Sequence, residues 1–79
     1  MGQLVGEMRL FAFEMIPKGW AACEGQLLAI SQNTALFSLL GSRFGGDNKT
    51  KFALPDMRGK APAGAQYCIA LQGEFPAQP

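Results

Sequence analysis

The chain has 79 residues, a length that fits one domain and is too short for two. Hydrophobic residues make up 48% of the chain, so a collapsed structure is expected rather than a disordered one. The net charge of +1 lacks the strong positive bias of proteins that bind nucleic acid, and the absence of histidine removes the commonest general base and metal ligand. Nucleic-acid binding and catalysis are therefore both disfavoured.

A chain this short needs a source of stability beyond its core, which is usually worth about 3 to 5 kcal/mol at this size. Cys23 and Cys68 offer one disulfide, but each lies in an apolar run, so we predict two free thiols. Two isolated cysteines without histidine cannot form a four-ligand zinc site, and neither a metal nor another cofactor is predicted. Only 16% of residues are charged, against roughly 25% in an average soluble protein, which favours association between subunits.

The N-terminal part of the chain predicts a strand over residues 7–13. Met8 and Leu10 alternate on one face, and the opposite face turns apolar at Phe11 and Phe13. This pattern predicts a strand that leaves a solvated edge and becomes covered on both sides.

A tight turn is expected at residues 17–19, where Pro and Gly suit a sharp change of direction. Two short apolar segments follow, at 20–23 and 26–30, separated by Glu24 and Gly25. Because Glu-Gly is a weaker version of the Asp-Gly pair of two-residue loops, these segments predict a small hairpin.

A short helix is predicted over residues 32–40. Ser31 has the side chain of an N-cap residue, and Leu36, Leu39 and Leu40 share one helical face. Gly41 follows in the position where a left-handed cap costs least.

Residues 42–50 have the composition of a surface loop, which we expect Phe44 to anchor. Residues 52–59 predict a short edge segment that cannot continue a ladder beyond Pro55. Residues 67–71 are apolar on both faces and predict a central strand paired with the first strand. Together these elements predict one α+β domain over residues 1–79, with small, mostly antiparallel strands and one short helix.

Three side chains have both a structural and a functional interpretation. Trp20 can stack on a sugar face, but the small Ala21 and Ala22 beside it favour a buried anchor. Asp56 and Arg58 form a charge pair, which more often organises a turn or ties down a neighbouring segment or subunit. We favour the structural interpretation for all three.

The hydroxyl and thiol groups of the chain give the only basis for a hydrolase hypothesis. None of them has a histidine partner to activate it, so no catalytic residue is predicted. The glycine pair at 45–46 superficially resembles a phosphate loop, but a helix rather than a buried strand precedes it. Asp47 and Asn48 alone fall well short of a calcium loop.

Five segments resemble the phage tail collar domain family in order and spacing, over nearly all of residues 5–64. They are GEMRLFA at 6–12, PKGWAACEGQLL at 17–28, ISQNTALFSLLG at 30–41, FGGD at 44–47 and FALPDMRG at 52–59. Residues 67–76 resemble the C-terminal end of longer members, which carry a substantial segment between the two matching parts. Glu14, Glu24 and Ala29 depart from the residues common at those turns.

The resemblance implies a structural, non-enzymatic subunit of a phage tail fibre or a phage-derived particle, associated as a trimer or polymerised into a filament. The alternative is a host-attachment module whose 42–50 loop contacts a glycan or receptor through polar and aromatic side chains. The contact residues would be Arg43, Phe44, Asp47, Asn48 and Lys49. No signal peptide or membrane span is recognisable, so synthesis in the cytoplasm and a place in the virion tail or an extracellular particle are expected.

Overall fold

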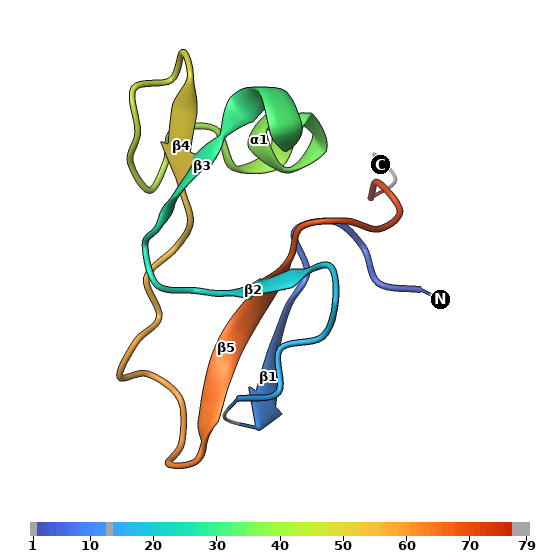
Figure 1. The fold of residues 1–79 in the computed structure, drawn as a ribbon, viewed down its shortest axis with the longest axis vertical. Helices are drawn as coiled ribbons and strands as arrows, with labels where there is room; N and C mark the ends of the chain where they lie inside the picture. The colour runs from blue at the N-terminus through green and yellow to red at the C-terminus, as the bar shows by residue number, and fades with distance from the viewer. Residues whose placement is uncertain (1, 13, 77–79) are drawn as a thin grey trace.

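Five short strands, a 3-10 turn and one α-helix make up the described part of the chain. The computed structural model describes residues 2–12 and 14–76. In chain order the elements are β1 (Met8–Ala12), β2 (Trp20–Ala22), β3 (Leu27–Ala29), η1 (Ile30–Gln32), α1 (Thr34–Leu40), β4 (Lys51–Ala53) and β5 (Ala65–Ala70). Figure 1 shows β1, β2 and β5 in one part of the molecule, and β3, β4 and α1 in the other. The predicted α+β class is confirmed.

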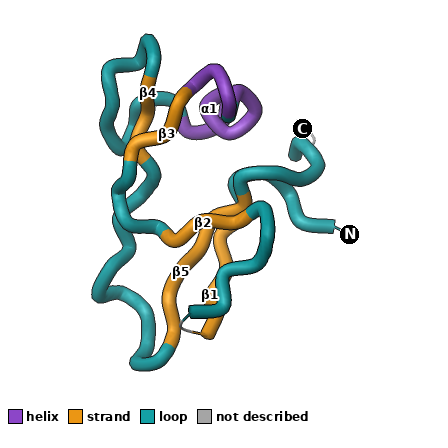
Figure 2. The backbone as a smooth tube through the Cα atoms, in the orientation of Figure 1, coloured by secondary structure: helices purple, strands orange, loops and turns teal. Residues whose placement is uncertain are grey.

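The larger sheet has the order β1-β5-β2, and both of its ladders are antiparallel. Met8 lies opposite Ile69 in one ladder, and Trp20 lies opposite Ala70 in the other. Strand β5 is therefore central and pairs with the first strand, as the apolar run at residues 67–71 predicts. Figure 2 shows the three strands of this sheet grouped together, apart from β3 and β4.

The predicted hairpin between residues 20–23 and 26–30 is wrong, because β3 pairs with β4 and β2 pairs with β5. Gln26 holds the connection open: its side-chain amide donates to the carbonyl of Ala22 at 2.8 Å, and its backbone carbonyl accepts from Leu54 at 3.0 Å. The chain therefore crosses from one sheet to the other.

The core lies on both faces of the larger sheet. One cluster contains Val5, Cys23, Leu36, Phe52, Leu54 and Ile69, which are at most 2% exposed. A smaller cluster, formed by Trp20, Cys68 and Ala70 with Phe11 packed against them, contains the neighbours of Ile69 along β5. Since successive residues of a strand face opposite sides, β5 contributes to both clusters.

The helix begins two residues later than predicted. Ser31 lies within η1, and Asn33 occupies the N-cap position of α1 without a side-chain cap. The Asn33 amide instead donates to the carbonyl of Ala29 at 3.0 Å. Gly41 ends the helix as expected, with its N–H bonded to the carbonyl of Phe37 and a φ of 57°. Its ψ of −150° lies outside the left-handed helical region.

The predicted burial of the first strand on both sides is wrong. Met8 is 46% exposed and Leu10 is 45% exposed, because β1 forms an edge of the sheet and its apolar face is not covered along its length. On the opposite face, Phe11 is half-buried against Trp20. Phe13 lies outside the described residues.

Candidate functional site

Trp20 lies in a covered position on the sheet. It is 9% exposed, and the ring of Phe11 meets it edge-on with centroids 5.1 Å apart. The guanidinium of Arg9 lies over the Trp20 ring, 5.6 Å from its centroid, a geometry that gives a cation–π attraction. A sugar has no free indole face to stack on, so the side chain acts as a packing anchor.

Asp56 and Arg58 form a paired turn on the surface. The Arg58 Nε donates to Asp56 Oδ1 at 2.9 Å, Nη2 donates to Oδ2 at 2.7 Å, and the Arg58 backbone N–H donates to Oδ1 at 3.1 Å. The side-chain bonds and then the backbone bond lower the pKa of Asp56 to about 2. Arg58 therefore stabilises the turn to which it belongs.

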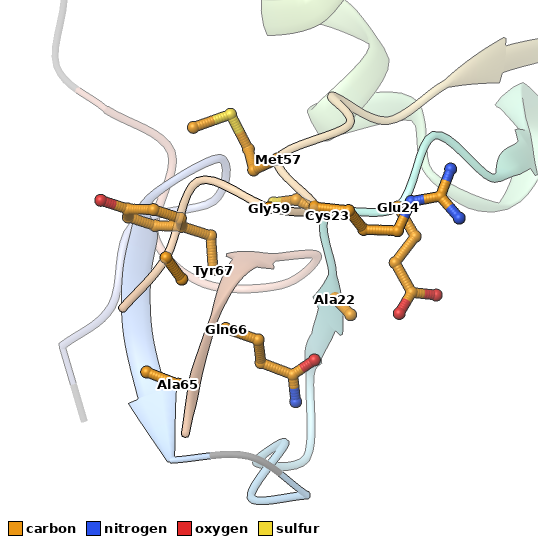
Figure 3. Close-up of a pocket in the computed structure, with 10 residues that line it drawn as sticks. Ala22, Cys23, Glu24, Met57, Gly59, Ala65, Gln66 and Tyr67 are labelled. Atoms are coloured by element: carbon orange, nitrogen blue, oxygen red, sulfur yellow. The ribbon is translucent and has the colours of Figure 1, made fainter. Parts of the chain in front are cut away.

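A hollow of about 280 Å³ lies between this turn and β5 (Figure 3). Its lining includes Cys23, Glu24, Met57, Arg58, Gln66 and Tyr67. In Figure 3, Met57 and Tyr67 lie on one side of the hollow and Glu24 on the other. A hollow lined by apolar side chains together with the charged Glu24 and Arg58 can accept a small apolar group, but it does not bring a base to a nucleophile.

The two cysteines lie on opposite faces of the larger sheet. Ala22 lies opposite Cys68, and the next residue, Cys23, donates its N–H to the carbonyl of Tyr67 at 3.0 Å. Neighbouring residues of a strand point to opposite faces, which keeps the two sulfur atoms apart. Both thiols are free and buried, in agreement with the prediction. Burial raises the pKa of Cys23 to about 11, so this thiol is protonated and weakly nucleophilic at neutral pH.

The loop at residues 42–50 is organised by Asp47. Its carboxylate accepts hydrogen bonds from the backbone N–H groups of Lys49, Thr50 and Lys51 at 2.8 to 3.0 Å, and from the Thr50 hydroxyl at 2.8 Å. These bonds hold the pKa of Asp47 well below its ordinary value of 3.8. At Gly46, an added Cβ would lie 2.5 Å from the carbonyl oxygen of Lys51, so only glycine fits there.

The predicted contact residues of this loop divide into two groups. Asp47 is committed to the loop's own backbone, while Arg43, Phe44, Asn48 and Lys49 are exposed. Phe44 is 44% exposed, so the expectation that it anchors the loop is wrong. The anchoring role belongs to Asp47, which sequence reasoning treated only as a ligand contact.

Residues 2–12 and 14–76 contain neither a cluster of metal-ligating side chains nor a membrane-spanning helix. In these ranges no three His, Cys, Asp or Glu side chains gather closely enough to share a metal ion. The same residues include no helix with the length and hydrophobicity that a membrane crossing requires.

The phage tail collar domain profile matches residues 6–62, which is more than half of the chain. The chain belongs to the phage tail collar domain family. Comparison with curated proteins gives no match. Membership implies a structural role in a phage tail fibre, a place in the virion tail and an oligomeric assembly.

The segment that matches the family is shorter than the folded domain. The match includes β1 to β4 and the Asp56–Arg58 turn, and it ends before β5. Yet β5 is the central strand of the larger sheet and supplies the buried residues Cys68, Ile69 and Ala70. The sheet described here therefore depends on residues outside the matched segment.

Proposed function

We propose that this chain is a self-associating structural subunit of a phage tail fibre or a phage-derived particle, acting as one collar domain over residues 1–79. One observation carries the proposal: a large share of its bulky apolar side chains is exposed. In residues 2–12 and 14–76, those at least 40% exposed are Leu4, Met8, Leu10, Met15, Ile16, Leu27, Phe44 and Phe75. Exposed apolar side chains that form a contiguous patch mark interfaces between proteins.

These side chains are unevenly distributed along the chain. Four of the eight, Met8, Leu10, Met15 and Ile16, come from β1 and the turn that follows it. The net charge of +1 gives copies of the chain little mutual repulsion. A trimer or a filament would cover this surface, and a contact between different patches propagates when it does not close into a ring.

The proposed role is non-enzymatic. The chain has no histidine. The hollow is lined by Cys23, whose thiol has a pKa of about 11, and by Arg58, which is ion-paired with Asp56. These groups provide neither an activated nucleophile nor a general base near neutrality.

Sedimentation velocity and electron microscopy test the proposal directly. The proposal predicts particles whose mass is a multiple of 8.5 kDa at micromolar concentration, with trimers or filaments in the images. A stable 8.5 kDa monomer over that range would contradict it.

A second function, attachment to a host glycan, is favoured by the exposure of Phe44 together with Arg43 and Lys49 on the 42–50 loop. A triple variant with alanine at these positions keeps Gly46 and Asp47, which hold the loop. A glycan array with the native and triple-variant proteins tests this function. Binding by the native protein alone supports it, and no binding by either counts against it.

A further inference from the structure

The β1 edge of the larger sheet directs backbone hydrogen-bonding groups away from the molecule. Ala70 donates to the carbonyl of Glu7 at 2.8 Å, so the bonded pairs within the β1–β5 ladder are those of Arg9 and Phe11. In an antiparallel ladder the bonded and non-bonded pairs alternate. The N–H and C=O groups of Met8 and Leu10 therefore point outward, away from β5.

Within Met8–Ala12 this edge lacks most of the features that usually protect a sheet from further pairing; a bulge precedes it, where Gly6 donates to the carbonyl of Ala70 and Ala70 donates to the carbonyl of Glu7. Natural edges carry lysine, proline or a bulge, or are covered by a loop. Arg9 is the one charged residue of β1, and it is drawn to the opposite face: its Nε donates to Glu7 Oε2 at 2.6 Å and its guanidinium lies over Trp20. Met8 and Leu10 are left as exposed apolar side chains along the edge.

A second copy of the same strand is the occupant that fits this edge. The family assembles as oligomeric tail fibres, and the two open strands are identical. In antiparallel pairing about Leu10, the five residues of β1 lie opposite one another, with Met8 opposite Ala12 and Arg9 opposite Phe11 of the second copy. The Ala12 carbonyl already accepts from the Met15 N–H at 2.9 Å and accepts its second hydrogen bond from the partner strand. No like charges face each other in this register, and arginine beside an aromatic ring is a favourable neighbour.

The neighbouring registers are less favourable. Pairing about Arg9 places two guanidinium groups directly opposite each other, which is repulsive. Pairing about Met8 requires Gly6 to continue the ladder, but its N–H is already bonded to the carbonyl of Ala70 at 2.8 Å and its φ of +85° turns the chain away.

We propose that two copies of this chain pair antiparallel through β1, with Leu10 opposite Leu10 of the second copy, and so join two three-stranded sheets into one sheet of six strands. The proposal rests on the self-association put forward above and names the surface that carries it. A two-fold contact does not by itself form a trimer. A trimer would use a second surface, and the two contacts together would link trimers into larger particles.

Cysteine cross-linking tests this contact, because Cys23 and Cys68 are at most 2% exposed and do not compete with a new surface thiol. Leu10→Cys places a thiol on the proposed two-fold axis, Ala12→Cys places one two residues away from it, and Leu27→Cys places one on β3, at a side chain that is 56% exposed. Each variant is oxidised at micromolar concentration, and the covalent dimer is measured on a denaturing gel. Because cysteines whose Cα atoms are more than about 7 Å apart do not bridge, Leu10→Cys is expected to give about tenfold more dimer than either control.

A dimer yield of Leu10→Cys no higher than that of Leu27→Cys overturns the β1 contact. A dominant yield from Ala12→Cys overturns the register. The mass of the native protein, measured in parallel, separates these outcomes from a failure of the proposed function: an associated native protein without the Leu10 cross-link refutes the β1 contact alone, whereas a monomeric native protein refutes self-association.

Discussion

The two edges of the larger sheet differ in how far the rest of the chain covers them. At the β2 edge, Gln26 donates its side-chain amide to the carbonyl of Ala22, and the Met57 N–H donates to the carbonyl of Cys23 at 2.8 Å. At the β1 edge, Met8 and Leu10 are about half exposed. The chain closes one edge with its own residues and leaves the other open, as expected of a subunit that pairs with another subunit.

The difference follows from what the chain does after each strand. After β2 it crosses to the smaller sheet, and the segment after β4 returns beside that crossing, where Gly25 donates to the carbonyl of Pro55. After β1 the chain turns sharply, with the Met15 N–H bonded to the carbonyl of Ala12, and passes to β2 on the far side of β5. The strand order β1-β5-β2 therefore leaves β1 at an edge of the sheet.

The largest loss of stability is expected from a substitution in β5, the central strand that pairs with both edge strands. Ile69 is 1% exposed at the centre of the sheet, and Ile69→Ala should lower the free energy of unfolding by about 2 to 5 kcal/mol through lost burial and a cavity. Urea denaturation followed by circular dichroism measures this loss. The exposed Leu27 is the control, since Leu27→Ala should change stability by less than about 0.5 kcal/mol. Equal effects of the two substitutions would show that β5 is not central.

A smaller effect is expected at the closed edge. Gln26→Ala removes the donor to the Ala22 carbonyl in a partly buried position and should cost about 1 kcal/mol. Gln3→Ala removes a similar amide donor, from an exposed bond to the Gln72 carbonyl, and should cost less. Thermal unfolding of both variants checks the order. A reversed order would indicate that Gln26 does not protect the β2 edge.

The smallest effect is expected from the surface carboxylates. Hydrogen bonds in the folded state hold the pKa of Asp47 and Asp56 below the ordinary value of 3.8, Asp56 at about 2. The folded state therefore binds fewer protons, so the stabilisation is present above about pH 4 and is lost as the pH falls toward 2. Thermal unfolding from pH 6 to pH 2 should show a decline that is shallower in Asp56→Asn. An identical decline in the variant would contradict the role of the Asp56–Arg58 turn.

Local patterns in the sequence predicted the elements whose shape depends on local residues. The spacing of Leu36, Leu39 and Leu40 predicts the helix, and the positive φ of Gly41 fits its end. The apolar run at residues 67–71 predicts a central strand because a strand between two others is covered on both faces. The family resemblance was likewise confirmed over residues 6–62.

Features that depend on distant partners were predicted less well. The Glu24-Gly25 pair favours a hairpin locally, but Gln26 and the apolar faces of β2 and β3 favour other strands. The apolar alternation of β1 predicts burial, whereas its place at the edge leaves Met8 and Leu10 exposed. Periodicity identifies an apolar face without telling whether the same chain or another copy covers it.

The role of Asp47 was missed, although the sequence carries a signal for it. An Asp that follows two glycines and precedes Asn48 is a typical acceptor for backbone N–H groups two to four residues ahead. That interpretation assigns the carboxylate to the loop itself and leaves Arg43, Phe44, Asn48 and Lys49 among the loop's exposed side chains.

The most direct test of the central claim is the mass of three proteins in sedimentation velocity at micromolar concentration: the native chain, Leu10→Lys and Leu27→Lys. Both leucines are exposed, so each substitution should change folding stability by no more than about 0.5 kcal/mol. If copies pair through β1, Leu10→Lys places two ammonium groups together at the contact and should weaken association at least about tenfold, while Leu27→Lys associates like the native chain. Equal association by the two variants would contradict pairing through β1.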